Sequence, residues 1–471
     1  MVFSSSTFLF LFLPITLLGY YLVGRRLRNL FLLGMSLLFY AWGGPRAALL
    51  MVASILINYL CGLWVGAASG KASPWPKRLA VFCAVAANLG ILFYFKYLNF
   101  AVETAQRLFH FTAEVRQIAL PIGISFFTFQ GMSYVLDVAM GKAKVQRNPL
   151  KIALYISLFP QLIAGPIVRY SDIEAQIDSR EIDLDKLASG VQRFAVGLVK
   201  KAWIANTLGQ VADGVFNPAV PNSSVGLTWL GVICYMFQIY FDFSGYSDMA
   251  IGLGRMFGFE FLENFRHPYS AKTMTDFWRR WHISLSSWFR DYVYIPLGGN
   301  RRGNQYLHQL TVFLLTGLWH GASWSFVLWG LWHGLWLMAE KPLIKSGKLD
   351  RIPGWLQWLF TMLRVLIGWV LFRRESVQGT LQLLGIMFGL AQPERVIYTA
   401  AWYLDGWVIL TLIAAVLACV PWREVLGERF NGWLESDKGV LCARVAACAL
   451  LLFGAVLVIT STYNPFIYFR F

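Results

Sequence analysis

The sequence predicts an all-α polytopic membrane protein, and three observations support this prediction. Of the 471 residues, 57% are hydrophobic and 14% are charged, whereas a soluble domain carries about 25% charged residues. The mean hydropathy is +0.54, and apolar stretches near the length that crosses a bilayer, about 20 residues, recur along the chain. The 20 Trp residues fit a protein whose aromatic side chains lie at membrane interfaces.

Six apolar stretches in the N-terminal part are predicted to be membrane segments. They comprise residues 8–24, 29–43, 47–65, 79–95, 118–140 and 152–168. Basic loops follow the first, third and fifth stretches, at 25–28, 71–78 and 142–151. Because Lys and Arg concentrate in cytoplasmic loops, these loops are placed in the cytoplasm and the N-terminus outside. The sixth stretch is expected to be broken or re-entrant near residues 165–166, a Gly-Pro pair.

The middle of the chain is less regular. Residues 190–216 contain basic side chains and are predicted to form a helix that lies at the membrane interface. Residues 225–258 form a long apolar stretch with polar interruptions, and residues 260–305 are basic, aromatic and expected to be cytoplasmic. Residues 309–339 contain no Lys, Arg, Asp or Glu. A straight helix of that length would measure about 45 Å, so a break is expected near 321–323.

Three further apolar stretches complete the predicted architecture, at residues 355–372, 400–420 and 440–459. With them the chain is expected to contain about eleven membrane segments, in a single domain that comprises residues 1–471. No internal repeat or domain-scale linker interrupts it.

The formal net charge of +16 would suggest a nucleic-acid partner in a soluble protein. Here Lys and Arg gather in short loops between apolar stretches, so the lipid bilayer is the expected partner and nucleic acid is not. The six Cys residues form no CxxC pair, so no metal site is predicted. The sequence contains no Walker motif, GxSxG or HExxH, which removes support for ATP-driven transport and for hydrolase and zincin functions.

Polar residues inside apolar stretches are costly in a membrane and are therefore candidates for function. His320 lies near the middle of the uncharged stretch 309–339. A neutral imidazole can act as a general base, and a histidine hydrogen-bonded to a neighbouring helix is an equally good interpretation from chemistry alone. His333 has Trp residues on the same helical face and is interpreted as a packing residue.

The segment 276–289 is interpreted as one helix on which Trp278, His282 and Leu285 share a face. Its arginines, Arg279 and Arg280, either extend to the membrane surface from an interfacial helix or hold phosphate. Asp242 and Asp248 lie between apolar flanks. They either line an aqueous passage or pair with nearby arginines, and pairing is the preferred interpretation.

Several long strings of the sequence resemble the membrane-bound O-acyltransferase family. They are Leu-Pro-Ile-Gly-Ile-Ser-Phe at 120–126, Leu-Ile-Ala-Gly-Pro at 162–166, Phe-Asp-Phe-Ser-Gly-Tyr-Ser-Asp at 241–248, Phe-Trp-Arg-Arg-Trp-His-Ile-Ser-Leu-Ser at 277–286 and Gly-Leu-Trp-His-Gly at 317–321. The resemblance implies a multi-helix fold with re-entrant and interfacial helices around a central tunnel. It also implies that His320 matches the near-invariant histidine of the family and His282 its second polar position, both catalytic.

The same resemblance implies an acetyltransferase in the bacterial inner membrane. Acetyl groups would pass from cytoplasmic acetyl-CoA, used as a substrate with no tightly bound cofactor, to an exopolysaccharide, with alginate or an alginate-like polymer expected. The expected substrate-binding residues are Arg279, Arg280, Trp281, Asp242, Asp248 and Trp319. A periplasmic esterase-like acetyltransferase and other polysaccharide-modification subunits are the expected protein partners.

Two alternatives remain open at this point. In the first alternative, the protein is an acyltransferase subunit for another envelope polymer, such as cellulose, peptidoglycan or teichoic acid. The second is a transporter of polysaccharide units, which would also use broken helices and buried polar residues. Inverted repeats would favour a transporter, and the sequence shows none.

Overall fold

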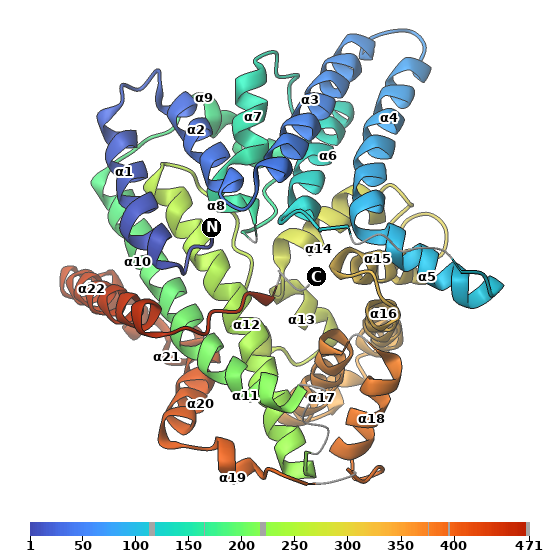
Figure 1. Ribbon diagram of the computed structural model, residues 1–471, viewed down its shortest axis with the longest axis vertical. Helices are drawn as coiled ribbons and strands as arrows, with labels where there is room; N and C mark the ends of the chain where they lie inside the picture. The colour runs from blue at the N-terminus through green and yellow to red at the C-terminus, as the bar shows by residue number, and fades with distance from the viewer. Residues whose placement is uncertain (113–117, 164, 217–222, 375, 394–395, 468–471) are drawn as a thin grey trace. The chain divides into compact units, whose positions relative to one another are not determined.

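The computed structural model describes residues 1–471 except 113–117, 164, 217–222, 375, 394–395 and 468–471. The described residues form helices and connecting loops, with one isolated β-bridge between Ser223 and Tyr398, which confirms the predicted all-α class (Figure 1). The chain divides into two compact units, residues 1–194 with 249–262 and residues 195–248 with 263–471. The single domain expected from the sequence stays a prediction.

Unit 1 contains the first eleven helical elements, in which η marks a π-helical segment. They are η1 (Phe8–Phe12), α1 (Leu13–Leu22), α2 (Arg28–Ala41), α3 (Pro45–Ala68), α4 (Trp75–Leu92), η2 (Phe93–Tyr97), α5 (Leu98–Phe109), α6 (Ile124–Met140), α7 (Pro149–Ser157), α8 (Phe159–Leu162) and α9 (Tyr170–Asp178). Helix α6 begins six residues later than the predicted segment 118–140, because Gly123 adopts a φ of +77° and interrupts the approach to the helix. The sixth segment is interrupted, but earlier than the predicted position at 165–166: α7 and α8 are separated at Leu158, and α8 already ends at Leu162.

Paired asparagines connect two long helices of unit 1. Asn58 on α3 and Asn88 on α4 are buried and exchange side-chain hydrogen bonds of 3.1 and 2.9 Å. Gly131 on α6 packs directly against Asn58. Small residues and interhelical hydrogen bonds of this kind allow helices to associate closely where the hydrophobic effect between them is weak.

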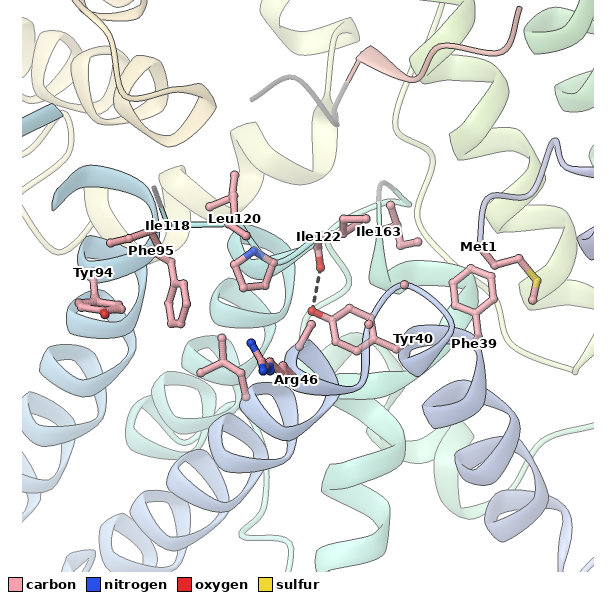
Figure 2. A pocket seen from close by; sticks show the side chains of 16 residues that line it. Met1, Phe39, Tyr40, Arg46, Tyr94, Phe95, Ile118, Leu120, Ile122 and Ile163 are labelled. Atoms are coloured by element: carbon pink, nitrogen blue, oxygen red, sulfur yellow. Dashed lines mark hydrogen bonds between the residues drawn. The ribbon is translucent and has the colours of Figure 1, made fainter. Parts of the chain in front are cut away.

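Unit 1 also contains an apolar cavity of about 660 Å³ (Figure 2). Residues at the end of α2, the beginning of α3 and the segment 118–122 line the cavity, and Arg46 is the charged residue among its described lining. The Tyr40 hydroxyl donates a hydrogen bond of 2.8 Å to the carbonyl oxygen of Ile122 and ties α2 to that segment. None of the candidate catalytic residues lines this cavity.

Two helices, α10 (Leu184–Val199) and α12 (Val225–Met256), contribute residues to both units. The remaining helical elements belong to unit 2. They are η3 (Lys200–Ala205), α11 (Asn206–Phe216), η4 (Pro268–Ser270, a 3-10 turn), α13 (Met274–Arg280), α14 (Ile283–Phe289), η5 (Arg290–Tyr294), α15 (Gln305–His320), α16 (Trp324–Lys345), η6 (Leu349–Arg351, a 3-10 turn), α17 (Gly354–Arg373), α18 (Val377–Met387), α19 (Ala400–Tyr403), α20 (Gly406–Cys419), α21 (Trp422–Glu435) and α22 (Asp437–Thr460).

The expected break at 321–323 is confirmed, because α15 ends at His320 and α16 begins at Trp324. The two helices pack against each other through glycines. A Cβ atom on Gly317 would collide with the carbonyl oxygen of Phe326, and one on Gly330 would collide with that of Phe313. This close packing places the C-terminal end of α15, and with it His320, against the first turns of α16.

Five helical segments of the described chain are long and apolar enough to cross a membrane. They are Pro45–Ala68, Trp75–Phe109, Val225–Met256, Gly354–Arg373 and Asp437–Thr460. A sixth is obtained if α20 and α21, bent by 70°, together form one broken span. A multi-pass membrane protein is therefore supported, whereas the expected count of about eleven segments is not confirmed. Two predicted segments, 8–24 and 29–43, correspond to the shorter apolar helices Phe8–Leu22 and Arg28–Ala41.

Candidate active site

His320 is the last residue of α15 and lies in an aromatic environment in unit 2. Its side chain is 6% exposed, and its ring centroid is 5.2 Å from that of Trp329 and 5.0 Å from that of Phe372. A small cavity of about 10 Å³ adjoins it. Its lining residues are apolar or aromatic apart from the histidine: Ile239, Phe243, Trp281, His320, Trp329, Trp369, Phe372 and Ile467. The imidazole therefore meets any group in this cavity in a largely water-free setting.

The interpretation of 276–289 as one helix is wrong. Helix α13 ends at Arg280, His282 has a φ of +45°, and α14 begins at Ile283. The backbone N–H of Ile283 donates to the carbonyl oxygen of Asn264 (2.9 Å), and the N–H of Arg266 donates to that of Arg280 (3.0 Å). These bonds with the segment 264–266 replace the ones that would have continued the helix. Left-handed backbone at a non-glycine residue is uncommon and often marks a functional position.

Asn264 determines which nitrogen of His282 carries the proton. The backbone N–H of Ser284 can only donate, and it lies 3.2 Å from Oδ1 of Asn264, so this atom is the amide oxygen and an acceptor. Nδ1 of His282 lies 3.1 Å from the same oxygen and must therefore donate a hydrogen bond to it. The other nitrogen, Nε2, has no hydrogen-bond partner among the described residues. In the neutral ring Nε2 carries the lone pair, so His282 is arranged to accept a hydrogen bond.

His282 lies outside the helices that are long enough to cross a membrane. Its side chain is 1% exposed, and burial lowers its pKa from the usual 6.5 to about 3. Loss of hydration disfavours the charged imidazolium. The residue is therefore neutral throughout the physiological pH range, which agrees with the acceptor role of Nε2.

Trp319 connects the surroundings of the two histidines. Its ring centroid lies 6.0 Å from that of His282 and 5.0 Å from that of His320. Phe243 has a comparable position, because it lines the cavity beside His320 and its centroid is 4.5 Å from that of His282. Trp281 also lines that cavity. The structure thus brings together four of the predicted site residues, which lie at the ends of α13 and α15 and at the turn before α14.

The two aspartates are paired, but with lysines and not with arginines as expected. Oδ1 of Asp242 lies 2.6 Å from Nζ of Lys201, and Oδ2 of Asp248 lies 2.7 Å from Nζ of Lys200. Neither aspartate lines the cavity beside His320. Both lysines belong to the segment 190–216, whose helical structure is confirmed. The burial of Lys201 shows that this segment also packs into the protein interior.

A second cavity in unit 2, of about 520 Å³, is basic. Four cationic side chains line it together with several polar ones, in the set Thr275, Arg279, Ser286, Arg290, Tyr294, Asn300, Gln309, Val312, Phe313, Leu337, Lys341, Ile344 and Lys345. Arg279 is part of this lining. Arg280 is not, because its Nε donates to Asp276 (2.9 Å) and its Nη1 to Ser270 (3.4 Å).

Glu340 holds the wall of this basic cavity together, and sequence reasoning missed it. Its carboxylate accepts hydrogen bonds from the backbone N–H groups of Met274 (2.9 Å) and Thr275 (2.8 Å) and from the Thr275 hydroxyl (2.8 Å). A carboxylate at a helix N-terminus is favourable because it pairs with free N–H groups and with the positive end of the helix dipole. The position of Glu340 at the end of the uncharged stretch 309–339 was the available signal. Among the described residues no cluster of three or more His, Cys, Asp or Glu could hold a metal ion.

Residues 142–373 match the model of MBOAT, the membrane-bound O-acyltransferase family. The chain belongs to this family and is a membrane-bound O-acyltransferase. It is 43% identical to a probable alginate O-acetylase of Pseudomonas putida and 39% identical to one of Azotobacter vinelandii, each over the whole of both chains. It is also 32% identical to a peptidoglycan O-acetyltransferase of Helicobacter pylori, over all of this chain and 98% of the relative.

Proposed function

We propose that this protein transfers acetyl groups from cytoplasmic acetyl-CoA across the bacterial inner membrane for O-acetylation of an exopolysaccharide, alginate or an alginate-like polymer. The observation that carries the proposal is the small aromatic cavity beside His320. Its volume of about 10 Å³ is room for about one water molecule, so His320 lies in a nearly dry enclosure. The choice of acetyl as the acyl group is supported by the names of the relatives. The names of the Pseudomonas putida and Azotobacter vinelandii relatives, both probable alginate O-acetylases, support the acceptor class.

His320 would act as the general base in this reaction. The acceptor hydroxyl oxygen forms a bond with the acetyl carbonyl carbon, and its proton passes to His320. The C–S bond of the thioester then breaks, and the sulfur leaves as a thiolate that takes the proton back as free CoA. Exclusion of water by the aromatic lining limits the competing hydrolysis of the thioester. Nε2 of His282 would accept a hydrogen bond from the acceptor hydroxyl or from an amide of the donor.

The basic cavity would hold the phosphates of the donor. Arg279, Lys341 and Lys345 line it, and charge-assisted hydrogen bonds from such side chains are the usual means of binding phosphate. The positive-inside rule places the basic segment 260–305 in the cytoplasm, where acetyl-CoA is available. A periplasmic esterase-like acetyltransferase and other polysaccharide-modification subunits would then deliver the acetyl group to the polymer.

Purified protein in proteoliposomes tests the proposal with radiolabelled acetyl-CoA on the side of the basic loops. Oligomers of mannuronate, peptidoglycan fragments and cello-oligosaccharides serve as parallel acceptors, each with and without the periplasmic proteins that co-purify with the chain. Label is expected in mannuronate oligomers when the co-purified proteins are present. Label in peptidoglycan fragments alone would replace the acceptor with the one named for the Helicobacter relative. Absence of thiol release from acetyl-CoA with every acceptor would refute the donor.

A further inference from the structure

Three buried rings of unit 2 have nitrogen atoms that the acetyl-transfer step described above does not use. They belong to Trp278 on α13 and to Trp329 and His333 on α16. The ring centroid of His333 lies 5.0 Å from that of Trp278 and 4.8 Å from that of Trp329, and the two Trp centroids are 5.5 Å apart. His333 and Trp329 are fully buried, and Trp278 is 8% exposed. The three rings therefore form one cluster, which we call the ring cluster.

The ring cluster contains four nitrogen atoms that have no hydrogen-bond partner among the described residues. They are Nε1 of Trp278, Nε1 of Trp329 and both ring nitrogens of His333. Burial of a polar group without a partner is unfavourable, and such groups in native proteins usually serve water or a ligand. A neutral His333 and two indoles supply three N–H donors and one lone-pair acceptor. A ligand that fits them carries carbonyl oxygens and at least one N–H group, which is the chemistry of an amide.

The ring cluster lies between the two cavities of unit 2. Trp329 lines the small cavity beside His320, whereas Leu337 and Lys341 line the basic cavity. These residues and His333 follow one another at intervals of four along α16, so each step rises about 6 Å and the series from Trp329 to Lys341 rises about 18 Å. Trp278 packs against the wall of the basic cavity, since its ring centroid is 5.1 Å from that of Phe313, which lines this cavity.

We infer that the ring cluster is a binding subsite for the amide groups of the arm that links the phosphates of the acyl donor to its thioester. The inference rests on the proposed function, which places the phosphates in the basic cavity and the thioester beside His320. The pantetheine arm of CoA carries two amides between these ends. As the arm enters, it separates the rings, and its amide groups pair with the four nitrogens. Gly368 on α17 lets the His333 ring pack closely against that helix, because a Cβ atom there would collide with Nε2.

His333→Phe tests the subsite, because it keeps a ring and removes both nitrogens. Kinetics are measured with acetyl-CoA and with S-acetyl-N-acetylcysteamine, a donor that retains only the amide next to the thioester. His333 lies one helical turn beyond Trp329 and is expected to meet the second amide. The KM for acetyl-CoA should therefore rise about tenfold, the effect of one or two lost hydrogen bonds, while the KM for the short donor stays unchanged. His333→Gln, which keeps a donor and an acceptor, should restore part of the affinity.

Trp332→Phe is the matched control on the same helix, because its Nε1 is already bonded to the carbonyl oxygen of Arg364 (2.9 Å). It should leave the KM for both donors unchanged. If His333→Phe does not fold, Trp278→Phe carries the same comparison. An unchanged KM for acetyl-CoA in the folded variant, or an equal rise with both donors, overturns the subsite. Inactivity of the wild-type protein with both donors would instead overturn the proposed function.

Discussion

A buried ion pair in unit 2 holds the C-terminal segment against the cavity that contains His320. Lys201 and Asp242 have side chains only 1% and 2% exposed, and Nζ and Oδ1 lie 2.6 Å apart. The other carboxylate oxygen of Asp242 accepts a hydrogen bond of 2.9 Å from the backbone N–H of Ile467, and Lys201 also donates to the carbonyl oxygen of Pro465. Ile467 lines the small cavity. Asp242 is therefore expected to position the cavity wall and not to contact the substrate.

Asp242→Asn removes the negative charge and leaves the ammonium of Lys201 buried without compensation. Breaking a buried ion pair in this way typically costs about 3–5 kcal/mol. Replacing both partners by apolar residues, as in Lys201→Met with Asp242→Leu, is often nearly neutral for stability because no charge remains buried. The double variant still leaves the N–H of Ile467 without its acceptor. Stability should therefore largely recover in the double variant, while acetyl transfer per folded molecule stays reduced.

Thermal unfolding of the detergent-purified proteins and acetyl transfer per folded molecule measure these two effects separately. Asp248→Asn is the control, because its partner Lys200 is 22% exposed and water compensates for the lost charge. It should destabilise the protein much less than Asp242→Asn. Equal melting temperatures for Asp242→Asn and the wild type, or full activity in the double variant, would refute the reasoning.

Three further predictions concern the candidate site. His320→Ala and His320→Gln should both lower acetyl transfer by at least about a hundredfold, as expected for loss of a general base, and a folded Gln variant with near-native turnover would contradict this role. Arg279→Ala should raise the KM for acetyl-CoA, because Arg279 lines the basic cavity. Arg280→Ala should leave this KM unchanged, because Arg280 pairs with Asp276. Steady-state kinetics of the two single variants test the assignment, and equal changes in KM would contradict it. Burial lowers the pKa of His282 to about 3, so below pH 6.5 the unfolded chain takes up a proton that the folded chain does not. The free energy of unfolding should therefore fall by about 1.4 kcal/mol per pH unit below 6.5 through this residue. Thermal unfolding between pH 7 and pH 5 should show a weaker pH dependence in His282→Asn than in the wild type. The same pH dependence in both proteins would contradict this assignment.

Composition and local pattern determined much of this protein without a structure. The scarcity of charge and the repeated apolar stretches predicted a helical membrane protein, because a bilayer requires each backbone polar group to be satisfied within its own helix. The uncharged stretch 309–339 predicted both the break between α15 and α16 and the unusual position of His320. These features depend on residues near one another in sequence, so a one-dimensional pattern contains them.

Only the tertiary structure decided how the candidate residues are used. Asn264 lies 18 residues before His282 in sequence, yet its hydrogen bonds end α13 and determine the tautomer of the imidazole. Arg279 and Arg280 are neighbours of the same type, and only the packing of α13 against α16, through Glu340, places one in the basic cavity and leaves the other paired with Asp276. Asp242 pairs with Lys201, and their bonds with residues 465–467 bring the end of the chain to the cavity. Such roles depend on contacts between segments distant in sequence, and the identity of a side chain does not specify its partner.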